Sequence, residues 1–198
     1  MRPTRRRLLD AAEKLVRTTG LSGATTKALA REANCSEAML YKHFESKDAL
    51  LVCLLRERLP ALLSAAYGDP AHDVADVQGT EQSCRHLVHR TMRFYETALP
   101  LLCPLLADPA LLAAYSADPL RRSNGTPEEP LTAVISALER WRAAGRIRSD
   151  ADLETAATSL VGACFQRFFL RHCGFGEETR DQEEFAAALA RALARSLA

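Results

Sequence analysis

The residues with the clearest capacity for chemistry lie in one short stretch, EANCSEAMLYKHFESKDALL, residues 32–51. Lys42 offers a cation, Tyr41 and His43 offer hydrogen-bonding rings, and Met39 offers an apolar side chain. A cation pairs with phosphate or guanine, and an apolar group meets the methyl group of thymine. These residue types suit the reading of a nucleic acid, provided that one element presents them together.

A short helix would present these side chains together. At about 100° per residue, Leu40 and Phe44 fall on one side of such a helix and predict its buried face. The opposite side carries a small residue that permits close approach, an apolar side chain, a cation and two flanking rings. The outward set is Ala38, Met39, Tyr41, Lys42 and His43.

The segment before this helix predicts a second short helix and a tight turn. Thr25 or Thr26 can cap a helix that carries Leu29, and Ser36 can cap the helix that follows. Asn34 stands at the turn, where Asn tolerates the left-handed conformation at modest cost. Two short helices separated by such a turn form a helix-turn-helix, predicted at residues 25–44, whose second helix enters the DNA major groove.

The remainder of the chain also predicts helices, and no segment alternates with the period of two that marks a strand. Pro100 and Pro104 are expected to break up a short apolar segment, and residues 68–79 and 116–130 are expected to be loops. The sequence therefore predicts an all-α chain of about nine helices. Their expected ranges are about 8–20, 26–33, 36–44, 47–66, 81–98, 101–115, 128–144, 151–173 and 181–197.

The stretch TTKALAREANCSEAMLYKHFESKDALL resembles the DNA-binding domain of the TetR family of bacterial repressors. That family pattern has a T-T pair, an apolar-Ala pair, an A-G-V-S turn, L-Y-x-H-F, and then K-[DE]-x-L. The resemblance covers about residues 4–55, and the turn departs from the pattern at Asn34 and Cys35. The matching segments are Thr25-Thr26, Leu29-Ala30, Ala33 to Ser36, Leu40 to Phe44 and Lys47 to Leu50.

The resemblance implies a three-helix helix-turn-helix DNA-binding domain at residues 1–46 and a larger helical ligand-binding and dimerisation domain at 47–198. It implies a homodimer that binds a pseudo-palindromic double-stranded DNA operator and releases it when a small molecule fills the C-terminal domain. It implies no enzyme activity and no cofactor. The DNA contacts that it implies are Arg5, Arg6, Thr26, Ser36, Ala38, Met39, Tyr41, Lys42, His43 and Lys47.

Charge and composition agree with this interpretation. Residues 1–58 hold 12 Lys and Arg against 7 Asp and Glu, a net charge of +5, whereas the remainder carries −4. A basic end of this kind is a candidate surface for a polyanion. The six cysteines show no framework spacing, and no apolar run approaches the roughly 20 residues of a membrane span. A cytoplasmic protein with reduced thiols and no membrane segment is expected.

The aromatic residues after position 90 are core residues by default, and some are expected to line a ligand cavity between helices. Glu96 is the single acidic residue from Gln82 to Ala107, and Glu154 is the single one from Leu153 to Gly176. A buried cation would find few partners there, so an apolar neutral or anionic effector is expected. The candidate ligand-binding residues are Phe94, Tyr95, Trp141, Phe165 and Phe168.

Two apolar stripes near the C-terminus predict a four-helix dimer interface. Either stripe can instead be satisfied by the core of its own chain. The candidate interface residues are Leu153, Ala157, Leu160, Val161, Cys164, Phe185, Leu189, Leu193 and Leu197.

Other features of the sequence suggest functions besides DNA binding, and each has a simpler explanation. Cys84, His86 and His89 have partial metal-ligand spacing, but a site needs a fourth ligand, and surface or pocket-lining histidines are expected instead. Cys35 lies in the predicted turn, where a small apolar role is favoured over a redox switch. The alternatives are a helical small-molecule-binding protein or enzyme whose basic N-terminus is incidental, and a helical adaptor, although no catalytic signature motif is present.

Overall fold

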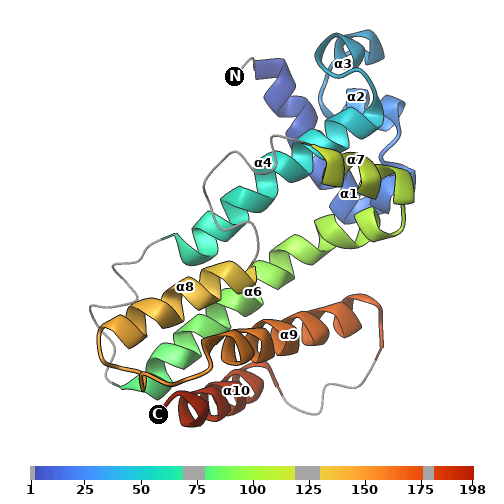
Figure 1. Ribbon diagram of the computed structural model, residues 1–198. Helices are drawn as coiled ribbons and strands as arrows, with labels where there is room; N and C mark the ends of the chain where they lie inside the picture. The colour runs from blue at the N-terminus through green and yellow to red at the C-terminus, as the bar shows by residue number, and fades with distance from the viewer. Residues whose placement is uncertain (1–2, 69–78, 119–129, 176–180) are drawn as a thin grey trace. The chain divides into compact units, whose positions relative to one another are not determined.

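The computed structural model describes residues 3–68, 79–118, 130–175 and 181–198. Within these ranges the chain forms nine helices and no strand, which confirms the predicted all-α class (Figure 1). Most residues of the predicted loops at 68–79 and 116–130 lie outside the described residues, although residues 116–117 belong to a helix and a helix begins at Pro130. The helices are α1 (Pro3–Gly23), α2 (Thr26–Glu32), α3 (Glu37–His43), α4 (Lys47–Tyr67), α6 (Thr80–Leu106), α7 (Pro109–Ala117), α8 (Pro130–Ala143), α9 (Leu153–His172) and α10 (Gln182–Leu197).

The chain divides into two compact units. Unit 1 holds residues 1–60 and 98–125, and unit 2 holds 61–97 and 126–198. Helices α4 and α6 each contribute to both units, so α7 and one end of α6 belong to the same unit as the helix-turn-helix. The predicted functional boundary at residue 46 stays a prediction.

Unit 1 has a core of aliphatic side chains from its helices. Charged contacts join α1 to its neighbours: Lys14 Nζ lies 2.6 Å from Glu32 of α2, and Arg58 Nε of α4 lies 2.7 Å from Glu13. The first helix changes direction at Gly20, whose positive φ of 70° marks the predicted stop. The buried residues that form the core include Leu8, Leu9, Ala12, Leu29, Leu40, Leu50 and Leu54.

Unit 2 is a helical bundle built on α6, α8, α9 and α10. Asp152 and Asp181 cap the last two helices by accepting backbone N–H bonds from the first turns. The hydroxyl of the half-buried Tyr67 donates to Oγ1 of the buried Thr91 at 2.8 Å. Burial raises the pKa of Cys84 and of Cys164 to about 12, so both thiols stay protonated at neutral pH.

The prediction of separate helices at 81–98 and 101–115 was wrong. Helix α6 continues through Pro100 and Pro104 to Leu106. Each proline removes one backbone N–H donor, but Leu99 and Leu101 are buried, and their burial offsets that loss. The break comes instead at Asp108, which caps α7 through two backbone N–H bonds and precedes Pro109 at a position where proline is tolerated.

Among the described helices, none is by itself both long and apolar enough to cross a membrane. The helices at Thr80–Pro104 and Pro109–Ala117 meet the length and composition criteria only as a bent pair.

The contrast between Phe44 and Tyr41 yields a stability prediction. Phe44 is 7% exposed and Tyr41 is 54% exposed. Phe44→Ala should lower the free energy of unfolding by about 3–5 kcal/mol, because it leaves a ring-sized cavity. Tyr41→Ala, a matched loss of an aromatic ring, should change it by less than about 0.5 kcal/mol. Urea denaturation followed by circular dichroism measures both, and equal losses would contradict the assigned faces.

Candidate nucleic-acid interface

The backbone between α2 and α3 forms the predicted tight turn. Thr25 caps α2 by accepting from Ala28 N at 3.1 Å, and Ser36 caps α3 by accepting from Met39 N at 3.2 Å. Asn34 adopts a φ of 51°, the left-handed conformation expected of it. The Cys35 amide then bonds back to the carbonyl of Ala30 at 2.9 Å, which closes the end of α2.

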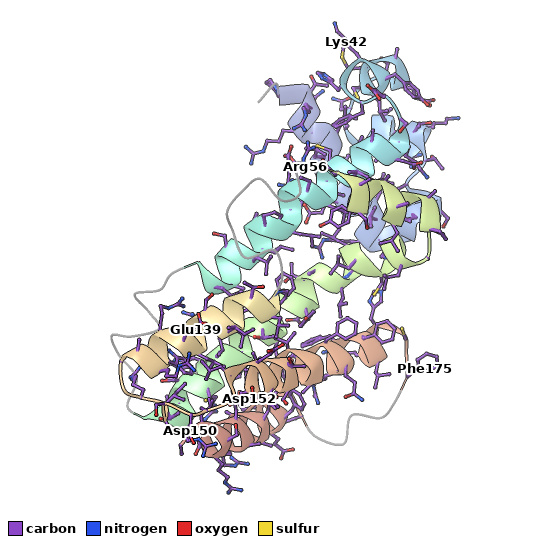
Figure 2. The ribbon with its side chains drawn as sticks, in the orientation of Figure 1. Lys42, Arg56, Glu139, Asp150, Asp152 and Phe175 are labelled. Atoms are coloured by element: carbon purple, nitrogen blue, oxygen red, sulfur yellow. The ribbon has the colours of Figure 1, made fainter. Side chains whose placement is uncertain are left out.

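Helix α3 presents the predicted reading face to solvent. Leu40 is fully buried and Phe44 nearly so, whereas Ala38, Tyr41 and Lys42 are exposed. Met39 and His43 are half-buried at the edges of this face. The Lys42 side chain projects outward from α3 (Figure 2). The arrangement combines a cation, an apolar side chain and two rings on one exposed surface, as major-groove reading requires.

Three more candidate residues surround this face. Ser36 is exposed, and its oxygen is already an acceptor for α3, which leaves its hydroxyl proton to donate to a phosphate. Thr26 Oγ1 donates to Glu37 Oε2 at 2.7 Å, so this hydroxyl ties α2 to α3. Lys47 is half-buried in the first turn of α4, where backbone amides favour an anion.

The three consecutive arginines of α1 have different surroundings. The Arg6 side chain is 72% exposed and lies 4.0 Å from Asp10, as suits a residue that contacts DNA. The Arg5 side chain is only 24% exposed and is engaged inside unit 1. Arg7, which sequence reasoning missed, donates to the carbonyl of Asn34 at 3.2 Å. The three consecutive arginines in the sequence indicate a basic site, but the sequence alone does not distinguish the residue that faces solvent from the two that bond within unit 1.

The turn also borders an open cleft of about 550 Å³. Cys35 is half-buried in its wall, together with Lys27 and Arg31 of α2. The thiol is therefore not fully buried, and the choice between a packing role and a redox switch stays a prediction.

Most of the candidate ligand-binding aromatics of unit 2 are interior residues. Phe94, Tyr95, Trp141 and Phe168 are buried, whereas Phe165 is 38% exposed. Tyr95 contacts the rings of Phe94 and Phe165 edge to face, with centroids 5.2 and 5.5 Å apart. Their contact with a ligand stays a prediction.

The two apolar stripes are largely used inside the monomer. Among the candidate interface residues, Val161, Phe185 and Leu189 keep partial exposure. The others are buried in the core of their own chain, and these are Leu153, Ala157, Leu160, Cys164, Leu193 and Leu197. Their packing against a second subunit stays a prediction, and the exposed faces of α9 and α10 are the surfaces that remain for such a contact.

The Cys84, His86 and His89 set does not converge on one point. Cys84 is fully buried, whereas His86 is exposed and His89 Nε2 lies 3.4 Å from Glu183. Burial and nearby Arg85 lower the pKa of His89 despite this carboxylate. Among the described residues, no group of three or more His, Cys, Asp or Glu side chains is arranged to hold a metal ion.

Comparison with known proteins agrees with this geometry. Residues 8–53 match the family model of bacterial regulatory proteins of the tetR family. An uncharacterized HTH-type transcriptional regulator of Bacillus subtilis, YvkB, is 36% identical over 80 residues, which are 39% of this chain and 42% of that protein. The chain spans about half the length of the curated relatives it matches.

Solved structures extend the likeness of fold to nearly the whole chain. A putative TetR-family regulator from Mesorhizobium loti has a TM-score of 0.71 at 20% identity, over 98% of this chain and 96% of that one. FadR from Bacillus subtilis, solved in complex with stearoyl-CoA, has a TM-score of 0.59 at 14% identity, over 98% and 99% of the two chains.

The helix-turn-helix with its capped, outward-facing α3 coincides with the segment that the family model matches. Residues 8–53 of this chain thus form a helix-turn-helix segment of the kind found in bacterial regulatory proteins of the tetR family.

Proposed function

We propose that this chain is a ligand-responsive DNA-binding transcriptional regulator, which acts as a repressor and is released from a pseudo-palindromic operator by a small effector. The observation that supports this function best is the exposed face of α3, with Lys42, Tyr41 and Ala38 opposite the buried Leu40. The face lies on a helix of seven residues, a length that crosses one major groove.

In this function α3 inserts into the major groove and the surrounding groups hold the phosphates. Lys42 contacts a phosphate or a guanine, and the Ser36 hydroxyl and Lys47 contact backbone phosphates. Arg6 adds a further contact from α1. Phosphate contacts release counterions, so binding weakens steeply as salt rises.

The alternative of a helical enzyme or carrier gives no reason for a cation, rings and an apolar side chain to share the outward face of α3. Regulation requires only binding, and we propose no catalytic activity, no cofactor and a cytoplasmic location. In contrast, an incidental basic N-terminus would not require the cation to stand opposite the buried side of α3.

The first test removes Lys42, the cation on the exposed face of α3. Lys42→Ala should weaken binding to DNA by about 1–3 kcal/mol per half-site without unfolding the protein, because Lys42 is exposed. Fluorescence anisotropy on a duplex that the wild-type protein selects from a random-sequence library measures the affinity at several salt concentrations.

A matched control removes a cation elsewhere. Arg142→Ala, at an exposed position on α8, should leave the affinity within about twofold of wild type, because only the local surface charge changes. Equal affinity of the Lys42→Ala and wild-type proteins at physiological salt would exclude Lys42 from the interface. Failure of the wild-type protein to select any duplex would exclude the proposed function itself.

A second feature supports the homodimer. Gly162 lies in the middle of α9, is exposed, and has open space where a Cβ would stand. Glycine in a helix interior costs about 1 kcal/mol relative to alanine, and packing within this chain does not require it. The same face carries Thr158, the partly exposed Phe165 and the stacked Phe169, with ring centroids 5.5 Å apart. A helix of a second subunit that crosses at Gly162 would cover these rings.

Phe165→Glu should therefore give monomers. A charge on this face would be buried without a partner in the dimer, whereas it stays hydrated in the monomer. Sedimentation velocity at micromolar concentration measures the oligomeric state, and Thr132→Glu, which adds the same charge at an exposed position of α8, is the matched control. A wild-type protein that sediments as a monomer, or a Phe165→Glu variant that remains a dimer, would contradict this interface.

For the effector we propose a mainly apolar molecule that is neutral or anionic. Unit 2 offers buried aromatic rings and a hydrogen-bonded hydroxyl pair, the half-buried Tyr67 and the buried Thr91. The structurally similar FadR of Bacillus subtilis was solved with stearoyl-CoA, which joins an apolar chain to an anionic group. An effector of this chemistry fits the scarcity of carboxylates between Gln82 and Ala107.

Decanoate, decanol and decylammonium form a matched series for this test, because the chain is the same and only the charge differs. We expect decanoate or decanol to raise the melting temperature by about 5–10 °C at saturating concentration and to release DNA. Stabilisation by decylammonium alone would contradict the charge argument. A stabilising ligand that leaves DNA affinity unchanged would contradict the coupling, because an effector acts only through its differential affinity for the two states.

A further inference from the structure

Arg5 contacts Glu57, Cys53 and Phe44 around one point of unit 1. Its Nη1 lies 2.7 Å from Glu57 Oε1 of α4, and its Nη2 donates to the thiol of Cys53. Its guanidinium carbon lies 5.5 Å from the centroid of the Phe44 ring, over its face. One planar group thus joins the first turn of α1 to α4 and to the residue that ends α3.

The contacts that hold Arg5 continue along α4 to Arg56. Arg56 Nη2 also donates to Cys53 Sγ, at 3.4 Å, and Arg56 Nη1 lies 3.3 Å from Asp118 Oδ2, the residue that caps the end of α7. Burial raises the pKa of Cys53, so the thiol between the two guanidinium groups is neutral. The Glu57 carboxylate pairs with Arg5, and the Asp118 carboxylate pairs with Arg56.

The space behind the end of α3 is not filled by side chains. A cleft of about 550 Å³ opens there, and both arginines contribute to its wall. Close packing on this side is therefore limited, and the guanidinium over the Phe44 ring is one of the contacts that the ring makes there.

We propose that Arg5 is a positioning residue rather than a DNA contact: held by Glu57, it fixes Phe44 and with it the C-terminal turn of α3, which carries Lys42 and His43. This inference rests on the proposed function, because the oriented helix is the one that reads DNA. Lysine cannot take this role, because one ammonium group cannot bridge the carboxylate and the thiol while it stacks on the ring.

The neighbouring Arg6 provides a matched control, since its side chain is 72% exposed whereas that of Arg5 is 24% exposed. A residue that contacts phosphate contributes about 0.9 to the slope of log affinity against log salt. A residue that orients the reading helix changes the affinity and leaves the number of phosphate contacts intact.

The experiment measures anisotropy on the wild-type-selected duplex, at several concentrations of KCl, for Arg5→Ala, Arg5→Lys, Glu57→Gln and Arg6→Ala. We expect Arg5→Ala, Arg5→Lys and Glu57→Gln each to weaken binding about tenfold with the wild-type salt slope. The double variant Arg5→Ala/Glu57→Gln should bind about as well as Arg5→Ala, because both changes remove the same link. Arg6→Ala should lower the magnitude of the slope.

Two results would overturn the proposal. A fall in the salt slope of Arg5→Ala by about one per subunit, with Glu57→Gln unchanged, would make Arg5 a phosphate contact. Wild-type DNA affinity in Glu57→Gln would show that the Glu57 carboxylate does not hold Arg5 in a position that matters for binding. This variant tests the positioning role even if Arg5→Ala does not fold. Thermal melting by circular dichroism identifies the folded variants. If the wild-type protein selects no duplex, the proposed function fails, which differs from both results.

Discussion

The burial of Leu40 and Phe44 is the constraint on which the reading surface depends. A helix of seven residues is too short to be stable in water alone, so α3 forms because these two side chains are held by the other helices of unit 1. Their burial fixes the rotation of α3 about its axis. Once that rotation is fixed, Ala38, Tyr41 and Lys42 must face solvent. The buried side of α3 thus contributes to stability, and its exposed side is the surface available for recognition.

Local features of the sequence were sufficient to predict α3, because each has a direct physical cause. Ser36 caps the helix, Asn34 takes the left-handed turn, and the spacing of Leu40 and Phe44 sets the buried side. The continuation of α6 through Pro100 and Pro104 was not predictable in this way. Proline lowers the stability of a helix locally, and whether the helix survives depends on burial that only the folded chain supplies.

The apolar stripes of α9 and α10 illustrate a second limit of sequence reasoning. Periodicity identifies a buried face but does not say whether the same chain or another subunit buries it. Here Leu160, Cys164 and Leu193 are buried within their own chain. The better indication of a second subunit is Gly162, because glycine lowers helix stability and the described residues leave open space where a Cβ would stand. A residue that costs stability without local benefit points to a contact outside the chain.

The arginines at the start of α1 show why charge alone does not assign a role. Arg5, Arg6 and Arg7 are adjacent in the chain, yet helical geometry turns each about 100° from the next. One faces α4, one faces solvent, and one reaches the turn carbonyl of Asn34. Arg5 and Arg7 thus bond to α4 and to the turn before α3, whereas the Arg6 side chain is exposed. The basic N-terminus therefore stabilises the orientation of the reading helix as well as adding to the positive charge of the surface.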